Sequence, residues 1–285
     1  MKRMGCCKIG WVFLPSMIFM LCLSVSTGSG AESFFEQIKK RGSVTVGTEA
    51  ASYPFEFIRE GKIVGYNKEI LDQVVQSWGI KLEQLDVPFA GLLAGLTQRK
   101  YDFIATNLFV NAERAEKYAY TLPTAAVDMA MVKRKGDDRV KSVNDMTGLI
   151  VGVAVPPSVT HSAYLELDGQ LKAQGKGAAS IRIFQSSPDM FIALANKQVD
   201  VLSLHVPGIL GGMQRMPDTF EMVGRFGKRY WSSWLTRPEN TDLRDAINTE
   251  LRKLRDSGFL APLQTKWFGY VMEIPDSGYL PPGAK

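Results

Sequence analysis

Two segments, GLLAGLTQRKYDFIA (Gly91–Ala105) and MFIALANKQVDVLSL (Met190–Leu204), share one design. Each begins with apolar residues at helical spacing. A mainly polar stretch that ends in Asp follows, and a short apolar run completes the segment. Apolar runs of this length, with such flanks, are typical of buried parallel strands. The repeated helix-to-strand unit therefore predicts two similar α/β lobes.

The residues that follow the two apolar runs are the first candidates for a functional site. Ligands of parallel α/β sheets bind beyond the carboxyl ends of the strands. Asn107 follows the first run, and His205 follows the second. We therefore expect both side chains to lie just past a strand end and to face a ligand.

The N-terminal residues predict an exported protein. Three basic residues precede an apolar run from 9 to 25, and small residues follow up to Ala31. This order is typical of a secretory signal peptide, so we expect cleavage near Ala31 and a periplasmic location. A membrane anchor is the alternative, but the run is close to the minimum of about 17 residues for a span, and Pro15 interrupts it.

Removal of residues 1–31 changes the composition. All three cysteines fall in this segment, so the mature chain would hold no disulfide and no cysteine metal site. The segment also holds three of the 34 Lys and Arg residues and none of the 29 Asp and Glu residues, so the net charge falls from +5 to +2. Neither a basic cluster with interleaved aromatic residues nor a histidine cluster remains. We therefore expect no nucleic-acid partner, no metal and no cofactor.

The rest of the chain alternates predicted helices and strands, which favours parallel α/β sheets. Asn67, Asn111 and Ser158 each stand where a predicted helix begins, and each has a side chain suited to the N-cap position. Apolar residues at spacings of four, four and three predict an amphipathic helix around residues 243–254.

Five short motifs occur in an order that is familiar from one family. They are GT to PF at residues 47–55, GYNKE at 65–69, YD at 101–102, NAER at 111–114 and KWFG at 266–269. With these motifs the chain resembles the extracellular solute-binding proteins of polar amino-acid ABC importers, the family 3 type, over nearly the whole mature chain. The resemblance implies an α/β fold: a two-lobed periplasmic-binding-protein clamshell with two hinge strands, type II-like.

The resemblance also implies the domain boundaries. Lobe 1 would comprise residues 32–126 and 231–285, and lobe 2 would comprise residues 127–230. The hinges would fall near Ala126–Met131 and Tyr230–Thr236. Closure of the hinges around a ligand in the cleft is the working motion that such a fold implies.

Arg114 is the strongest candidate for a ligand contact. Its planar guanidinium can hold a carboxylate through two parallel hydrogen bonds, which a lysine cannot do. The spacing Asn-x-x-Arg matches the family's Thr-x-x-Arg, and the resemblance implies that Arg114 grips a ligand carboxylate.

Other positions of lobe 2 and the cleft depart from the amino-acid-binding pattern. His205 stands where the family commonly has an Asp that pairs with an α-ammonium, and Asn107 and Phe109 stand where hydroxyl residues are usual. Pro156-Pro157 replaces a Gly-Thr pair and lacks backbone N–H groups, whereas Ser158 and Val159 can still present N–H groups at a helix start. We expect His205 to donate to a ligand oxygen, with an affinity that changes between about pH 5.5 and 7.5.

Four residues of lobe 1 complete the predicted ligand-binding set. Glu49 occupies a position that is often acidic in the family, near the ligand side chain, so it could receive an amine. Ser52 stands where a stacking Tyr is frequent, and the adjacent Tyr53 is the candidate aromatic platform. Phe89 aligns with an apolar wall position.

We therefore expect a monomeric solute-binding component of an ABC importer, which captures a small carboxylate-bearing ligand such as an amino acid and delivers it to an inner-membrane permease. One alternative is a binding protein for an organic or aromatic acid that lacks an α-ammonium. Another is a binding module that feeds a receptor or enzyme complex without transport.

An enzyme is a further alternative, which the residues disfavour. Some relatives are cyclohexadienyl dehydratases, in which the turn after the first lobe 2 strand carries a catalytic Glu. The corresponding residues 156–160 read PPSVT and hold no carboxylate. We therefore expect no catalytic residue.

Overall fold

One mixed sheet of eight strands runs through the molecule, in the order β5-β1-β6-β11-β7-β10-β8-β9, and β2-β3-β4 form a small second sheet. The computed structural model describes residues 10, 32–177 and 179–284, so the predicted signal peptide lies, apart from Gly10, outside the described residues. The strands are β1 (Ser43–Thr48), β2 (Ala51–Ser52), β3 (Glu56–Arg59), β4 (Lys62–Val64), β5 (Lys81–Asp86), β6 (Phe103–Phe109), β7 (Ala119–Arg134), β8 (Ile150–Ala154), β9 (Ser180–Phe184), β10 (Val201–His205) and β11 (Phe220–Thr236). The helices are α1 (Phe34–Arg41), α2 (Tyr66–Trp78), α3 (Phe89–Thr97), α4 (Ala112–Lys117), α5 (Val159–Ala173), α6 (Ser187–Ala195), α7 (Val206–Arg215), α8 (Thr241–Asp256) and α9 (Leu260–Phe268).

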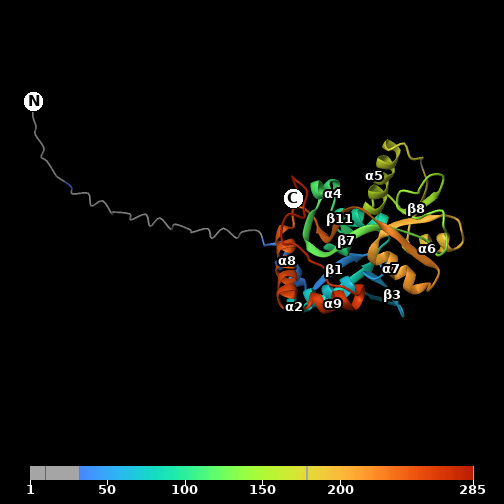
Figure 1. Cartoon of the computed structure of the whole chain (residues 1–285). Coiled ribbons are helices and arrows are strands. Elements are labelled where there is room, and N and C mark those ends of the chain that lie inside the picture. The colour runs from blue at the N-terminus through green and yellow to red at the C-terminus, as the bar shows by residue number, and fades with distance from the viewer. Residues whose placement is uncertain (1–9, 11–31, 178, 285) are drawn as a thin grey trace, which may run out of the picture. The chain divides into compact units, whose positions relative to one another are not determined.

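The sheet has the two-lobed α/β organisation that the sequence predicts. In lobe 1, β1 pairs in parallel with β5 and β6; in lobe 2, β8 pairs in parallel with β9 and β10. The long antiparallel strands β7 and β11 lie between these groups and join them. Figure 1 shows α2, α8 and α9 on the side of β1, and α5 and α6 on the side of β8.

The predicted lobe boundaries fall inside the two long strands. Val127 pairs with Tyr230, and Ala126 pairs with Trp231, so the two predicted boundaries lie directly opposite one another in the ladder. Ser33–Lys285 pack as one compact unit. The boundaries and the hinge role stay predictions.

The repeated unit of the sequence is repeated in the structure. Helix α3 leads into β6 and α6 leads into β10, and both turns place a residue, Arg99 or Lys197, in the left-handed region at a φ of 59°. The Asp of each repeat has a structural role. Asp102 accepts the backbone N–H of Thr45 in β1 at 2.8 Å, and Asp200 accepts that of Ile150 in β8 at 2.9 Å. Each carboxylate thus ties its strand to a parallel neighbour.

Two of the helix starts confirm their predicted N-caps, and one does not. Asn111 accepts from the N–H of Arg114, and Ser158 accepts from that of His161. Asn67 lies inside α2, where its buried amide donates to Glu56 and accepts from Thr124. The N-cap prediction for Asn67 is therefore wrong, because a buried carboxylate competes for its side chain.

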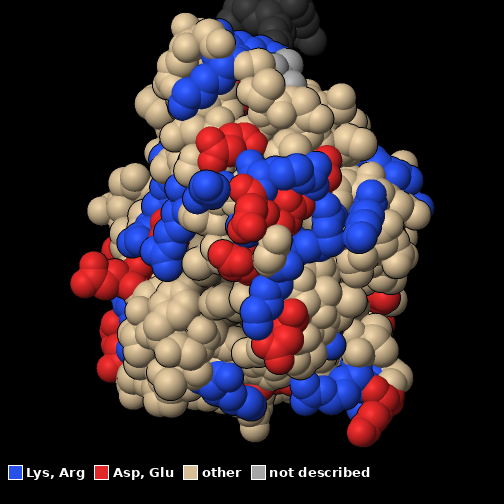
Figure 2. Space-filling view, turned by 45° about the vertical axis from the view of Figure 1, so that its right-hand side comes forward, with Lys and Arg blue, Asp and Glu red and all other residues tan. Residues whose placement is uncertain are grey.

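A buried apolar core lies between the helices and the sheet. One cluster surrounds Trp234 in β11 and Ile247 in α8, and two smaller clusters lie under α3 and beneath α6 and α7. Among the described residues, none of the helices combines the length and the apolar character that a membrane crossing requires. On the face seen in Figure 2, basic and acidic side chains are interspersed, so this face carries no field of a single sign.

Candidate functional site

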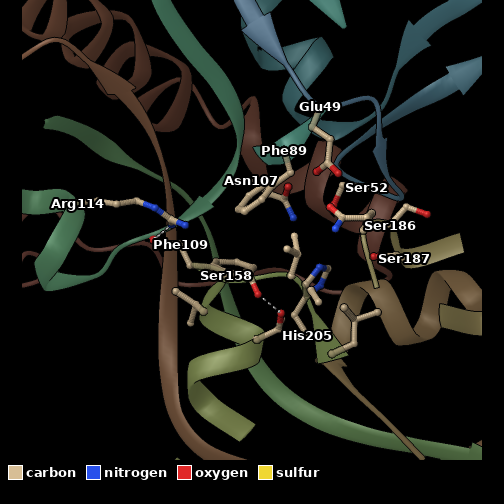
Figure 3. A pocket seen from close by; sticks show the side chains of 16 residues that line it. Glu49, Ser52, Phe89, Asn107, Phe109, Arg114, Ser158, Ser186, Ser187 and His205 are labelled. Carbon is tan, nitrogen blue, oxygen red and sulfur yellow. Dashed lines mark hydrogen bonds between the residues drawn. The ribbon is translucent and has the colours of Figure 1, made fainter. Parts of the chain in front are cut away.

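A pocket lies where the carboxyl ends of strands from both lobes meet, as expected for ligands of parallel sheets. It encloses about 540 Å³, part of it open to solvent. Figure 3 shows lobe 1 side chains facing those of lobe 2 across this space. Eight of the nine predicted site residues line it: Glu49, Ser52, Phe89, Asn107, Phe109, Arg114, Ser158 and His205. Asn107 lies within β6, two residues before its last residue, so the prediction that it follows the strand is wrong.

Arg114 begins in lobe 1 and reaches lobe 2. Its Nη1 donates to the carbonyl oxygen of Phe109 at 3.2 Å, and its Nη2 donates to that of Pro157 at 2.7 Å. The side chain is buried, and its Nε–H has no partner among the described residues. The ring of Phe89 lies 5.7 Å from the guanidinium carbon. A buried N–H without a partner costs free energy, and this guanidinium is the cationic group among the described residues of the pocket lining.

The turn before α5 presents fewer donors than predicted. Pro156 and Pro157 lack N–H groups, and the N–H of Ser158 donates to the carbonyl oxygen of Val155 at 3.1 Å. The expectation that Ser158 offers its backbone N–H to a ligand is therefore wrong, because the turn uses that group. Its hydroxyl lies 3.1 Å from the hydroxyl of Thr160, and both residues line the pocket.

His205 ends β10 and caps α7. Its Nδ1 accepts the backbone N–H of Gly208 at 3.0 Å, which assigns the proton of a neutral imidazole to Nε2. The ring is buried between those of Phe55 and Phe109, with centroids 5.5 and 5.4 Å away. Burial lowers the pKa of His205 to about 3. The expected titration between about pH 5.5 and 7.5 is therefore wrong, because these apolar surroundings disfavour the charged ring.

Glu49 follows β1 and is the acidic residue of the pocket lining. Burial and the nearby charge of Asp86 raise the pKa of Glu49 to about 7. Near neutral pH its carboxyl is therefore shared between the two protonation states. A cationic group in the pocket would favour the ionised form.

A buried carboxyl that the sequence analysis missed lies behind the lobe 1 wall. Glu56 accepts from the Nδ2 of Asn67, from the hydroxyl of Thr106 and from the backbone N–H of Asn107. Burial raises the pKa of Glu56 to about 8. These bonds fix the β6 backbone at Asn107, and the acid between Phe55 and Phe57 was the sequence signal for a buried polar group.

Tyr53 does not line this pocket. Its hydroxyl donates to the Oε1 of Gln214 at 2.7 Å, and its ring packs on that of Phe57. The ring also lies against Gly211 of α7, so Tyr53 contacts lobe 2 beside the pocket. Several polar lining residues were not predicted as site residues: Thr160, Gln185, Ser186 and Ser187. Ser186 is the N-cap of α6, a signal that was visible in the sequence.

No group of His, Cys, Asp and Glu side chains that could hold a metal ion occurs within the described part of the chain. The pocket combines one guanidinium, one carboxyl of raised pKa, an imidazole N–H and several hydroxyl and amide groups. Such a lining can bind a small polar molecule that carries an acidic group.

Comparison with known proteins identifies the class. Residues 44–270 match the family model of the bacterial extracellular solute-binding proteins, family 3. The chain belongs to this family, as its motifs predict.

Individual relatives are named as amino-acid-binding proteins. The chain is 24% identical over 269 residues to the L-cystine-binding protein TcyJ of Escherichia coli (strain K12), covering 92% of this chain and 98% of the relative. It is 26% identical over 268 residues to the probable amino-acid-binding protein YxeM of Bacillus subtilis (strain 168), covering 90% and 94%.

Solved structures share the fold. An ancestral arginine-binding protein bound to arginine superposes with a TM-score of 0.73 at 26% identity, over 80% of this chain and 99% of that chain. The arginine-binding protein of T. maritima, as its P235GK mutant, superposes with a TM-score of 0.71 at 27% identity, over 82% and 98%. These neighbours are two-lobed amino-acid-binding proteins.

Proposed function

We propose that the chain is the solute-binding component of an ABC importer and captures a small carboxylate-bearing ligand, an amino acid or a derivative, between its lobes. One observation carries this proposal: the guanidinium of Arg114 is buried at the pocket and reaches from lobe 1 to lobe 2, and its Nε–H has no partner in the described part of the chain. An arginine in this setting suits a carboxylate that bridges the lobes.

The polar groups opposite Arg114 support an acidic ligand. The Nε2–H of His205 is a neutral donor, and the described residues of lobe 2 that line the pocket include no carboxylate. A ligand oxygen can accept from His205, whereas an ammonium placed there would be buried without a negative partner, which is costly. An amine on the ligand would bind at Glu49.

These features also favour a second ligand class, the organic or aromatic acids that lack an α-ammonium. The specific observation is the neutral His205 in place of an acid. The names of the relatives, which include proteins that bind L-cystine and arginine, favour an amino acid or derivative. A thermal-shift screen with both classes decides between them.

The remaining parts of the proposal follow from the family. The ligand would pass to a permease in the inner membrane, the mature protein would act as a periplasmic monomer, and cleavage would occur near Ala31. We propose binding without catalysis, because the lobe 2 turn at residues 155–160 holds no carboxylate. An ancestral amino-acid-binding protein described as a precursor of cyclohexadienyl dehydratase superposes with a TM-score of 0.74 at 21% identity, a likeness of fold alone.

The experiment is a thermal-shift screen of the standard amino acids, L-cystine and a panel of organic acids, followed by calorimetry on each hit. We expect at least one carboxylate-bearing compound to raise the melting temperature, as linkage requires of a ligand that binds only the folded state. Arg114→Gln should weaken each hit, and an exposed control, Arg182→Gln, should not. Hits that bind Arg114→Gln with unchanged affinity would contradict the proposal.

A further inference from the structure

A second cavity of about 540 Å³, also partly open to solvent, lies beside the first pocket. Its walls come from the segment Ala51–Tyr53 of lobe 1 and from helices α6 and α7 of lobe 2. Ser187, at the start of α6, lines both cavities. The two cavities therefore adjoin at this residue.

The second cavity extends away from Arg114. In Figure 3, Arg114 lies at one side of the first pocket, and Ser186 and Ser187 lie at the other. A ligand held by Arg114 and directed across the pocket would therefore point toward Ser187 and the second cavity.

Arg215 of α7 lines the second cavity and has no described partner of opposite charge. Its guanidinium carbon lies 4.6 Å from the ring centre of Tyr53 and 5.6 Å from that of Phe57. The guanidinium of Arg215 makes neither a hydrogen bond nor an ion pair with another residue in the described part of the chain, and no Asp or Glu lines this cavity. A guanidinium supported by aromatic rings keeps its N–H edge available for a carboxylate.

The remaining lining of the second cavity is mostly apolar. Phe191, Ile192 and Met216 contribute side chains, and the buried glycines Gly208 and Gly212 of α7 complete this part of the wall. The wall of the second cavity at Ile192 is open to solvent, because this residue is 55% exposed. The space between Ser187 and Arg215 therefore suits the short apolar middle of a ligand rather than a second polar headgroup.

We infer that the ligand has two acidic ends: one is held at Arg114 in the first pocket, a short apolar linker passes Ser187, and the other end binds Arg215 over the ring of Tyr53. This inference rests on the proposed function and narrows its ligand class to elongated diacids, with or without amines. In this arrangement Tyr53 is the aromatic platform for the far end of the ligand, and not for the part of the ligand in the first pocket.

The test compares two-ended probes with one-ended partners by calorimetry. The pairs are L-cystine with S-methyl-L-cysteine, and pimelate with hexanoate. For the wild-type protein, we expect the two-ended member of at least one pair to bind about two- to fivefold more tightly than its partner, as a contact with an exposed guanidinium would provide. In Arg215→Gln this ratio should fall to near one. The matched control is Arg182→Gln. Like Arg215, Arg182 stacks on an aromatic ring, that of Phe184, but it lines neither cavity. This variant should keep the wild-type ratio.

The ratio is the readout because the loss of Arg215 from the ring of Tyr53 would weaken both members of a pair together. A wild-type ratio that persists in Arg215→Gln, or a wild-type protein that prefers the one-ended probes, would overturn the inference. The variant Arg114→Gln separates a failure of the second-subsite inference from a failure of the proposed function. If Arg114→Gln weakens both members while Arg215→Gln leaves the ratio intact, the proposed function stands and the second subsite does not exist. If the screen yields one-ended ligands but neither two-ended probe binds the wild type, the inference is overturned and the proposed function stands.

Discussion

The Nη2 of Arg114 in lobe 1 donates to the carbonyl oxygen of Pro157 in lobe 2 across 2.7 Å. This bond spans the pocket at the place where the family pattern would present backbone N–H groups to a ligand. Because prolines offer only carbonyl oxygens, the turn binds the arginine itself. The pair thus couples the position of the guanidinium to the approach of the two lobes.

Arg114→Ala should therefore weaken ligand binding by roughly 2–5 kcal/mol, the usual cost of removing one partner of a buried charge pair. The unfolding free energy should change less, because the substitution also removes a buried Nε–H that has no partner in the described part of the chain. Calorimetry with the tightest hit of the screen measures the first quantity, and urea unfolding measures the second. An unchanged affinity would remove Arg114 from the site.

His205 can be changed without losing its capping role. Asp and Asn are both good N-caps, so His205→Asp and His205→Asn should each retain the bond from the N–H of Gly208. We expect His205→Asp to bind standard L-amino acids at least tenfold more tightly than the wild type does, because only Asp supplies a charged partner for the α-ammonium. His205→Asn, the neutral control of the same shape, should show no such gain. Micromolar binding of several standard L-amino acids by the wild type, unaffected by Glu49→Gln, would contradict this account of His205.

Glu49 makes stability depend on pH. Its pKa in the folded protein is raised from 4.5 to about 7, so the folded state binds the proton more tightly than the unfolded state does. The contribution of Glu49 is then fully present below about pH 4.5 and is lost as the pH rises to about 7, by roughly 2–3 kcal/mol. Glu49→Gln should flatten the fall in unfolding free energy over this range. Glu116→Gln, on the exposed face of α4, serves as the control and should keep the wild-type profile. Identical profiles for Glu49→Gln and the wild type would show that this carboxyl does not titrate as inferred.

Gly211 allows α7 to approach Tyr53. A Cβ added at Gly211 would lie 2.1 Å from the Cδ1 of Tyr53, a ring that Phe57 and Arg215 hold in place. Gly211→Ala should therefore oppose the contact between lobes and weaken binding by about 1–3 kcal/mol, as overpacking does. The matched control is Gly169→Ala in α5, where an added Cβ would meet nothing within 4 Å.

The same pair of variants tests closure by small-angle scattering. We expect ligand to shrink the radius of gyration of the wild type and of Gly169→Ala, and to shrink that of Gly211→Ala less at equal saturation. Equal affinity and equal compaction in Gly211→Ala and Gly169→Ala would contradict a role for this contact in closure.

Local sequence signals predicted much of the fold and of the pocket. The two helix-to-strand repeats, the Asn111 and Ser158 caps and the family motifs depend on spacings of a few residues, and the structure retains them. Eight of the nine predicted site residues line one pocket, some from strands and others from helix starts.

The remaining features depend on contacts between distant segments. Glu56 acquires its partners Thr106 and Asn107 from a strand 50 residues away, and the low pKa of His205 follows from burial between Phe55 and Phe109. Tyr53 lies outside the first pocket because its ring packs against Gly211 of α7. None of these relationships has a signature in the local sequence.

The most direct measurement is a crystal structure of the protein with the tightest-binding compound of the screen. We expect a ligand carboxylate within hydrogen-bond distance of the guanidinium of Arg114, and a ligand oxygen facing the Nε2 of His205. A ligand that binds elsewhere, or one that places an ammonium at His205 and no acidic group at Arg114, would contradict the proposed site.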